Sequence, residues 1–538
     1  MILKNERSLF YLAVFALLAI LVFDLGNLDA IRQGTESFYL EVSKEMYQLD
    51  SYLTPYYRGE RHWSKAPLHF LFPFPFYKFG IFSNLFSARL SIVLLTIGLL
   101  VMTSFWIKRH FNIEKSLTIA FFGGTIFIIK YARIFMMEIP LSLLTFVGTL
   151  YFYDYLTTKK SKYFLISSTL IFLSTLIKGP VSLVLFTISI SFYLFYKKIV
   201  FHQKIPLKKL FLFFGVTIFV SSLWYAISYY RYGDEFFTYF FLRENLGKFS
   251  TQSYPMRHVF QGLLIFSLPW SLFIPSLFLK YYRLIKSKYK LQDIELYLLI
   301  CLFFFFVIWL IPSQRSHHYA APAVPFLLTL LLLAIKDPKI AGAKVTKVSL
   351  NIIFSFTILI ILLVTIVTFI SPGLFPSQDR TLALIISLII FLISSFLFKF
   401  HKNLLVKSLA ALFFIGCTWT FTASQFFLPL VPSKVVERVG EKDLVAYIKR
   451  SYFLEEAFQK KIEIVKREDF KLMKFSSDTY YFLNGDDYRK FGLSDKTIIE
   501  EHWFIWRRRL RFKAIINALM SEQFNKLKQD YFLFKGKN

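Results

Sequence analysis

The chain has 538 residues, of which 56% are hydrophobic, including 67 phenylalanines, and its formal net charge is +30. One soluble core cannot bury this much apolar sequence, so the composition excludes an ordinary soluble protein and predicts a polytopic α-helical membrane protein. Basic membrane proteins collect Lys and Arg in cytoplasmic loops, so the charge alone does not indicate nucleic-acid binding. The two cysteines, Cys301 and Cys417, lie in apolar runs and support neither a disulfide framework nor a cysteine metal site.

The first apolar run covers about 8–23 and follows the basic segment MILKNER. It resembles a signal sequence, but no small-residue cleavage site follows it. We therefore predict a retained first span with the N-terminus inside, followed by an outer loop over 25–83. Within this loop, 36–46 contains no Gly or Pro and has apolar residues at helical spacing. This pattern predicts an amphipathic helix along the outer membrane face.

Twelve further apolar segments follow, which with the first predict about thirteen transmembrane spans of about 20 residues each. They lie at about 84–107, 117–132, 139–156, 163–177, 180–196, 210–230, 259–279, 294–312, 319–335, 348–370, 381–398 and 408–428. Alternate connections are rich in lysine, namely 108–115, 157–162, 197–209, 280–290, 336–347 and 399–407. By the positive-inside rule these connections face the cytoplasm and the others face outward.

An odd number of spans from an inside N-terminus leaves 429–538 outside, after a membrane domain over 1–428. This last segment has the composition of a soluble domain. Alternating residues predict strands at 460–468 and 479–484, and helical spacing predicts helices at 441–452 and 514–524. We expect a small α/β domain of about 100 residues.

Ionisable residues gather where spans meet the outer connections. Glu36 lies in the first outer loop with Lys65, Glu138 precedes the fourth span, and Lys178 precedes a Gly-Pro break. Ionisable groups at such positions are costly to bury, so each is a candidate site residue. The alternative for each is a snorkelling or salt-bridged surface group.

The motifs around these residues resemble the bacterial membrane glycosyltransferases of the C-type (GT-C) fold, in the group of the lipid A aminoarabinose transferases and the protein O-mannosyltransferases. The motifs that carry the resemblance are TESFYLEVSKEM (35–46), Lys65-Ala66-Pro67, Glu138-Ile139-Pro140, Lys178-Gly179-Pro180, Arg243-Glu244-Asn245, Leu268-Pro269-Trp270, and the stretch from Ser313 through Tyr319 and Pro322 to Pro325. Together they cover the whole membrane part. The sequence departs from the family at Thr35, where relatives commonly have the Asp credited with the base role.

The resemblance implies a multi-pass enzyme of the bacterial inner membrane with a cytoplasmic N-terminus, about thirteen transmembrane helices and a C-terminal periplasmic α/β domain. It would transfer a hexose or pentose, with inversion, from a polyprenyl phosphate such as undecaprenyl phosphate to an acceptor on the periplasmic face. Lipid A is the first acceptor implied and protein hydroxyls are the second. A flippase for a lipid-linked sugar is the alternative of another class, and we find no inverted repeat that favours it. The partners implied are the donor, the acceptor and membrane lipids, and no nucleic acid.

The chemistry implied needs a carboxylate to take the acceptor proton and cations to neutralise the leaving phosphate. The expected catalytic residues are Glu36, which is the available acid beside Thr35, and Glu138. The expected substrate-binding residues are Thr35, Tyr57, Lys65, Lys178, Arg243, Glu244, Arg257 and Tyr319. Among these, Lys65 with Arg243 or Arg257 would hold the phosphate, Tyr57 and Tyr319 would donate hydrogen bonds, and Lys178 would pair with Glu138 to shape the sugar pocket.

No cofactor is expected. Adjacent histidines at His317 and His318 point in different directions on a regular element, and no His-Glu-x-x-His spacing occurs. A divalent metal stays open as the alternative.

Overall fold

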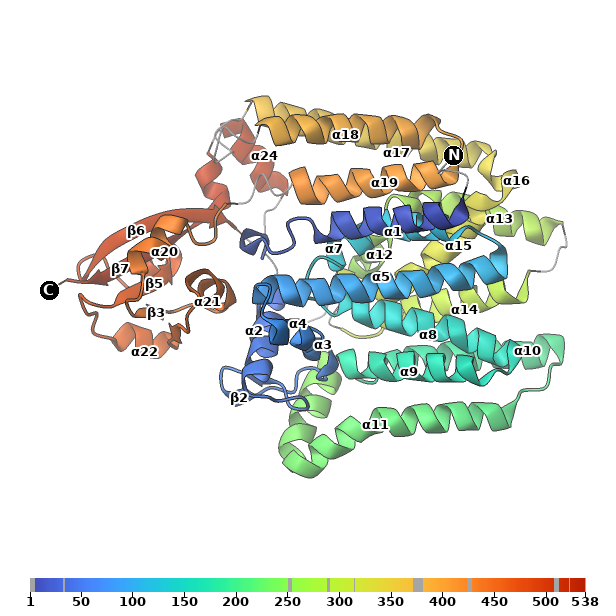
Figure 1. Ribbon diagram of the computed structural model, residues 1–538, viewed down its shortest axis with the longest axis horizontal. Helices are drawn as coiled ribbons and strands as arrows, with labels where there is room; N and C mark the ends of the chain where they lie inside the picture. Colours follow the sequence, from blue (N-terminus) through green and yellow to red (C-terminus); the bar gives the residue numbers. More distant parts are fainter. Residues whose placement is uncertain are drawn as a thin grey trace.

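The computed structural model describes residues 5–31, 34–249, 254–287, 291–313, 315–370, 381–422, 428–507, 512–521 and 523–537. A bundle of long helices forms most of the molecule, and a smaller region of strands and short helices stands at one end of it (Figure 1). The first helix starts at the end of the bundle away from this region. We refer to residues 429–538 as the C-terminal region.

The bundle is built mainly from long helices, and several of them are broken by turns. They comprise α1 (Glu6–Val22), α5 (Asn84–Phe111), α6 (Lys115–Gly123), α7 (Ile126–Tyr131), α8 (Glu138–Thr158), α9 (Ser161–Lys178), α10 (Val181–Phe201), α11 (Leu207–Phe237), α12 (Arg257–Phe266), α13 (Ile274–Lys286), α14 (Asp293–Val307), α15 (Val324–Lys336), α17 (Lys344–Ile370), α18 (Thr381–Phe400) and α19 (Leu404–Cys417). Within the described residues, seven helices are long and apolar enough to cross a membrane, or up to eight with the bent pair α12–α13. The chain is therefore a helical membrane protein, and the count of thirteen spans stays a prediction.

The chain over 259–279, predicted as one span, forms two helices instead. Helix α12 and the helical turn η5 (Trp270–Phe273) that leads into α13 are bent by 100°. The break falls at Pro269, which has no N–H to continue the helical ladder. Trp270 fills the corner, because its indole Nε1 donates to the Phe121 carbonyl at 2.7 Å and its ring stacks on Phe121. The segment predicted as a span at 259–279 is therefore sharply bent, which is the geometry of a broken span or of a re-entrant loop.

The outer loop folds into α2 (Gly34–Gln48), a small hairpin of β1 (Tyr56–Tyr57) and β2 (Glu60–Arg61), and the short helices α3 (Leu68–Leu71) and α4 (Phe74–Phe79). The predicted helix at 36–46 is confirmed by α2. Its predicted amphipathic exposure is wrong, because every residue from Glu36 to Ser43 is buried. Protein covers α2 on all sides over this stretch, so its polar groups contact protein partners.

The C-terminal region holds a five-stranded sheet in the order β4-β3-β5-β7-β6, with β3 parallel to both neighbours and the other pairs antiparallel. The strands are β3 (Leu444–Ala446), β4 (Glu463–Ile464), β5 (Tyr480–Asn484), β6 (Thr497–Trp506) and β7 (Lys528–Gly536). The helices are α20 (Ser433–Val439), α21 (Tyr452–Phe458), α22 (Arg467–Leu472), α23 (Gly485–Lys490) and α24 (Phe512–Ser521).

Strand β5 and helix α24 confirm two of the four predictions for this region, although α24 starts earlier and the described helix ends before 522. The strand predicted at 460–468 is confirmed in part, because β4 covers only Glu463–Ile464 and α22 begins at Arg467. The helix predicted at 441–452 is wrong. The first three of its five consecutive apolar residues form the interior strand β3, and all three are buried. An inner strand is covered on both faces, so it reads as a continuous apolar run instead of alternating.

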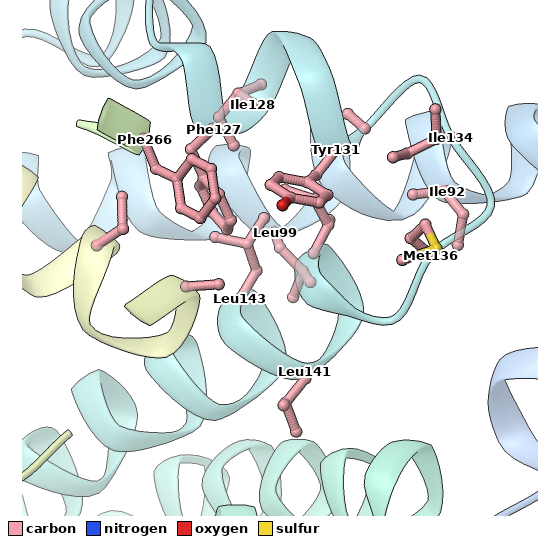
Figure 2. Packing of buried hydrophobic residues seen from close by; sticks show 14 of the residues in the cluster. Ile92, Leu99, Phe127, Ile128, Tyr131, Ile134, Met136, Leu141, Leu143 and Phe266 are labelled. Atoms are coloured by element: carbon pink, nitrogen blue, oxygen red, sulfur yellow. The ribbon is translucent and has the colours of Figure 1, made fainter. Parts of the chain in front are cut away.

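Buried apolar residues from most helices form one continuous core. Figure 2 shows the part where Phe127 and Tyr131 of α7 meet Phe266 of α12, beside Leu143 of α8. The Tyr131 and Phe266 rings meet edge to face, with centroids 5.2 Å apart. This packing fixes α7 and the start of α8, where Glu138 lies.

Candidate functional site

Lys65 lies just after the β1–β2 hairpin, on a segment that is firmly anchored. Trp63 and Ala66 on either side are 1% and 0% exposed. The Lys65 Nζ donates to the Ser64 carbonyl at 2.6 Å and lies 3.5 Å from the Glu244 carboxylate. Burial lowers the pKa of Lys65, and the neighbouring Glu244 opposes that shift. Two predicted site residues that are far apart in sequence are thus an ion pair.

Glu244 and Arg243 reach Lys65 because the chain turns back after α11. Gly233 has φ +54°, a left-handed conformation that costs glycine little, and it breaks the helix geometry inside α11. A π-helix, η3 (Thr238–Asn245), follows. π-Helical turns are rare and often occur at functional sites. Arg243 lies over the Tyr239 ring at 4.9 Å, on the same turn as Glu244.

His62 stands where charges from several parts of the chain converge. Its ring packs against Phe38, Tyr57 and Tyr239 at centroid distances of 4.9, 5.7 and 5.5 Å. Burial lowers the pKa of His62 to about 4, and positive charge from Lys65, Arg243 and Arg450 adds to the shift, against Glu244. The imidazole is therefore neutral near pH 7 and hydrogen-bonds the Tyr239 hydroxyl at 2.8 Å.

A second set of predicted residues gathers at the start of α8. Glu138 is 5% exposed, and its Oε1 lies 3.9 Å from His318 Nε2. Its Oε2 has no hydrogen-bond partner among the described residues. Lys178 lies over the Tyr319 ring at 5.1 Å, and its charge acts on the Glu138 carboxylate. Glu138, Lys178 and Tyr319 are thus brought together as expected from their motifs.

Electrostatic interactions join the two sets into one site. Lys65 acts on Lys178, and both Glu138 and Glu244 act on Tyr319. Both sets also act on Tyr39 of α2, since the charges of Glu138, Glu244 and Arg450 all reach its hydroxyl, while burial raises its pKa.

Glu36 lies outside this site. Its Oε1 accepts hydrogen bonds from Arg89 Nε at 2.8 Å and the Phe135 amide at 2.9 Å, and its Oε2 accepts from Arg89 Nη2 at 3.1 Å. Glu36 is 0% exposed and Arg89 is 2% exposed. Both oxygens of Glu36 are thus held by protein donors, whereas Glu138 has one oxygen without a partner among the described residues, so the base role of Glu36 stays a hypothesis with Glu138 as its alternative.

The remaining predicted residues lie at different places in the fold. Thr35 lies next to Glu36 in the first turn of α2 and is half-buried. Arg257 is exposed at the start of α12, whereas Arg243 adjoins the partner of Lys65. Tyr57 lies in β1 and packs on His62. Both arginines considered for the phosphate are exposed, and Arg243 is the one that adjoins the pair of Lys65 and Glu244.

Sequence reasoning missed His62 as a packing centre and Arg450 altogether. His62 precedes Lys65 by three residues, and its aromatic environment comes from segments that no local pattern connects. Arg450 belongs to the C-terminal region, and no sequence signal relates it to the outer loop. The packing of His62 follows from the folding of the outer loop against the turn after α11, and the contact of Arg450 follows from the docking of the C-terminal region.

The structure also contains two cavities, and none of the predicted site residues lines either of them. A polar one of about 1300 Å³ lies between the outer loop and the C-terminal region, and its walls include Glu45, Tyr56, Arg58, Arg231 and Lys461. An apolar one of about 230 Å³ is lined by residues of α7, the α12–α13 break, α17, α18 and α19, with Lys130 at its wall. Across the described residues, no three His, Cys, Asp or Glu side chains are grouped so as to hold a metal ion.

The fold is similar to two crystal structures of ArnT from Cupriavidus metallidurans. The structure bound to undecaprenyl phosphate matches with a TM-score of 0.70 at 15% identity, over 97% of each chain. The apo structure matches with a TM-score of 0.65 at 15% identity, over 93% of each chain. This likeness confirms the fold that the motifs led us to expect.

Sequence comparison gives relatives without a stated activity. No family model matches the chain. One uncharacterized protein of Aquifex aeolicus (strain VF5) is 25% identical over 357 residues, which are 65% of this chain and 68% of the relative. A second from the same organism is 28% identical over 327 residues, which are 59% of this chain and 71% of the relative.

Proposed function

We propose that the chain is an inverting membrane glycosyltransferase that moves one sugar from a polyprenyl phosphate carrier to an acceptor at the outer membrane face. The observation that carries the proposal is one site that combines a buried carboxylate oxygen without a partner among the described residues, on Glu138, with the cations Lys65, Lys178 and Arg243. Acid-base chemistry and a phosphate leaving group need these two features together. The undecaprenyl phosphate bound by ArnT, which has the same fold, supports the donor class.

In the proposed reaction the acceptor hydroxyl oxygen attacks the anomeric carbon from the face opposite the phosphate. The bond from that carbon to the phosphate oxygen breaks, and its electron pair leaves with the phosphate. Glu138 takes the hydroxyl proton, which replaces Glu36 as the proposed base. Lys65 and Arg243 stabilise the negative charge that develops on the departing phosphate. Lys178, Glu244 and Tyr319 would shape the sugar pocket, and no step needs a metal.

The apolar cavity supports a place for the prenyl chain. Its lining is almost wholly apolar, and Lys130 on its wall acts electrostatically on Glu138. A hydrocarbon chain seated there would bring its phosphate end toward the site. The apolar cavity would thereby align the polyprenyl phosphate donor before the acceptor binds.

The polar cavity supports an acceptor with a charged, sugar-sized headgroup. It carries both acids and bases, and Arg58, Arg231 and Lys461 suit phosphate groups. We therefore keep lipid A as the first proposed acceptor. Proteins with exposed hydroxyls are the second.

The proposed topology puts the N-terminus in the cytoplasm and the C-terminal region in the periplasm of the inner membrane, after thirteen spans. The connection between α10 and α11, and the short helix α16 (Pro338–Ala341), lie at the end of the bundle away from the C-terminal region (Figure 1). Both belong to the lysine-rich connections assigned to the inside, which supports this orientation.

The test is mass spectrometry of lipid A and of envelope proteins from cells with the gene, without it, and with a Glu138→Gln copy. We expect a mass difference of one sugar in lipid A that the Glu138→Gln copy does not restore. A one-sugar difference in protein would move the acceptor to the second class. No difference in either fraction, with lipid-linked sugar accumulating on the inner leaflet, would replace the transferase by a flippase.

A further inference from the structure

The segment that precedes α21 brings the C-terminal region into contact with the outer loop. This segment is fixed to α2 by Glu41, whose Oε1 accepts hydrogen bonds from the amides of Ser451 and Tyr452, both at 2.8 Å, and from the Ser451 hydroxyl at 3.3 Å. Glu41 is 9% exposed. The residue before this anchored pair is Arg450, so its backbone position is set by buried hydrogen bonds.

The Arg450 side chain extends from this anchor onto the outer loop. Its guanidinium lies 4.9 Å from the Phe38 ring and 5.7 Å from the Tyr57 ring, and its Nη1 donates to the Tyr57 hydroxyl at 3.0 Å. Cation–π contact and a charge-assisted hydrogen bond thus hold the same tyrosine. The two rings themselves meet edge to face at 4.9 Å.

The hydrogen bond from Arg450 makes the Tyr57 hydroxyl oxygen an acceptor. A phenol has one hydrogen to donate, and here its oxygen accepts from Arg450, so the hydrogen stays available for a second partner. Burial raises the pKa of Tyr57, which keeps that hydrogen in place at neutral pH. Since β1 side chains alternate, Tyr57 faces His62 while its neighbour Tyr56 lines the polar cavity.

Cations outnumber acids around Tyr57 and the neighbouring His62 ring, since Arg58 and Arg450 act on Tyr57 itself against Glu41. Lys65, Arg243 and Arg450 come from three separate stretches of the chain, and all three act on the His62 ring that packs against Tyr57. Glu244 is the acid in the same set. A hydroxyl hydrogen presented in such a field has an anion as its complementary partner.

We propose that Arg450 is a positioning residue that the C-terminal region contributes to the site, and that it holds the Tyr57 hydroxyl ready to donate to a phosphate group of the substrate. The inference rests on the proposed function and deepens it, because it makes the C-terminal region part of the donor-binding machinery. The bundle alone then has an incomplete phosphate site.

The test uses the full chain in detergent, with farnesyl phosphate as the prenyl phosphate probe and farnesol as the probe without the phosphate. Arg450→Gln should weaken farnesyl phosphate binding about tenfold, as expected for loss of a charge-assisted hydrogen bond, and leave farnesol binding unchanged. Arg450→Lys, which keeps the charge but not the geometry, should restore part of the affinity. Arg438→Gln is the matched control, since Arg438 is a C-terminal arginine that pairs with Glu500 and Glu501 instead.

A double-mutant cycle tests the route through the tyrosine. Tyr57→Phe should weaken binding as Arg450→Gln does, and the double variant should be little worse than either. Fully additive losses, or normal binding by a folded Arg450→Gln or Tyr57→Phe variant, would overturn the assignment. Failure of the unmodified chain to bind farnesyl phosphate better than farnesol would count against the proposed function itself. If Arg450→Gln does not fold, Tyr57→Phe and Arg450→Lys decide the question alone.

Discussion

At the scale of single residues, the two acids named from the sequence motifs have opposite environments. Glu36 has hydrogen bonds to both oxygens from Arg89 and a backbone amide, whereas Glu138 Oε2 has no partner among the described residues. The sequence locates both acids but does not distinguish them, because the partner of Glu36 lies on another helix. A carboxylate that stabilises the fold differs from one that takes part in a reaction in the groups that it contacts. When those groups are distant in sequence, no local sequence pattern shows the difference.

This difference predicts opposite effects when each of the two acids is replaced by glutamine. Glu138→Gln should lower transfer by about 10²–10³ and leave thermal stability in detergent near normal, because the amide keeps the shape but cannot take a proton. Glu36→Gln should lower the unfolding free energy by roughly 3–5 kcal/mol, because it leaves buried Arg89 without its counter-charge. Transfer assays and thermal unfolding separate the two. A stable Glu36→Gln protein without activity would return the base role to Glu36.

Lys65 should matter to the leaving group. Lys65→Ala should lower the transfer rate by about 10²–10³, since a developing phosphate charge loses its cation. Lys65→Arg should restore only part of the rate, because the planar fork differs from a compact ammonium. Lys434→Ala is a control of the same type, since Lys434 pairs with Glu501 within the C-terminal region. Normal turnover by Lys65→Ala would remove Lys65 from the phosphate role.

At the scale of elements, the outer loop should lose stability in acid. Burial lowers the pKa of His62 to about 4 and that of His69 to about 3, from 6.5. Because the folded loop disfavours protonated histidine, the free energy of unfolding of the loop is highest above pH 6.5 and decreases as the pH falls toward 4. When the pH is lowered from about 8 to about 5, His62 alone should reduce the free energy of unfolding of the loop by about 2 kcal/mol.

Protease resistance of the loop, measured against pH, checks this expectation. His69→Phe keeps an aromatic ring on Phe135, where the present rings stack at 4.2 Å, and should flatten the profile. His502→Gln, on the surface of β6, should not change it. A profile in His69→Phe identical to that of the unmodified chain would show that this histidine does not carry the effect.

Docking of the C-terminal region on α2 depends on Glu41. Glu41→Ala should weaken it by roughly 2–4 kcal/mol, because buried donors of Ser451 and Tyr452 lose their acceptor. Hydrogen exchange over 447–458 should rise strongly. Glu455→Ala, which removes only a half-buried ion pair with Lys44, should change exchange little. Equal protection in both variants would mean that apolar contacts alone hold the interface.

The elements also show what sequence patterns can and cannot give. Long apolar runs located the bundle helices because periodicity and length are local properties. The bend at Pro269 and the strand at β3 were missed, since each depends on what packs against it: the indole of Trp270 in one case and two neighbouring strands in the other. The motif residues were found, while Arg450 was not, because its role exists only after docking.

At the scale of the whole molecule, the proposed topology has a direct test. A reporter enzyme active only outside the cytoplasm should be active when fused after Leu428 and inactive when fused within 197–209, which carries the lysine excess. A second fusion within 108–115 should also be inactive. The reverse pattern would put every proposed site residue on the wrong side of the membrane.

The contact of Arg450 with Tyr57 also sets an order of events during biosynthesis. The ribosome makes the outer loop early, and it makes Arg450 only after every helix of the bundle. A nascent chain halted before that point has Lys65 and Arg243 but not Arg450. Under the proposed topology, the hydroxyl of Tyr57 acquires its partner only when the tail has been exported and has folded onto α2. The finished enzyme, and no partly inserted precursor, would therefore hold the lipid carrier firmly.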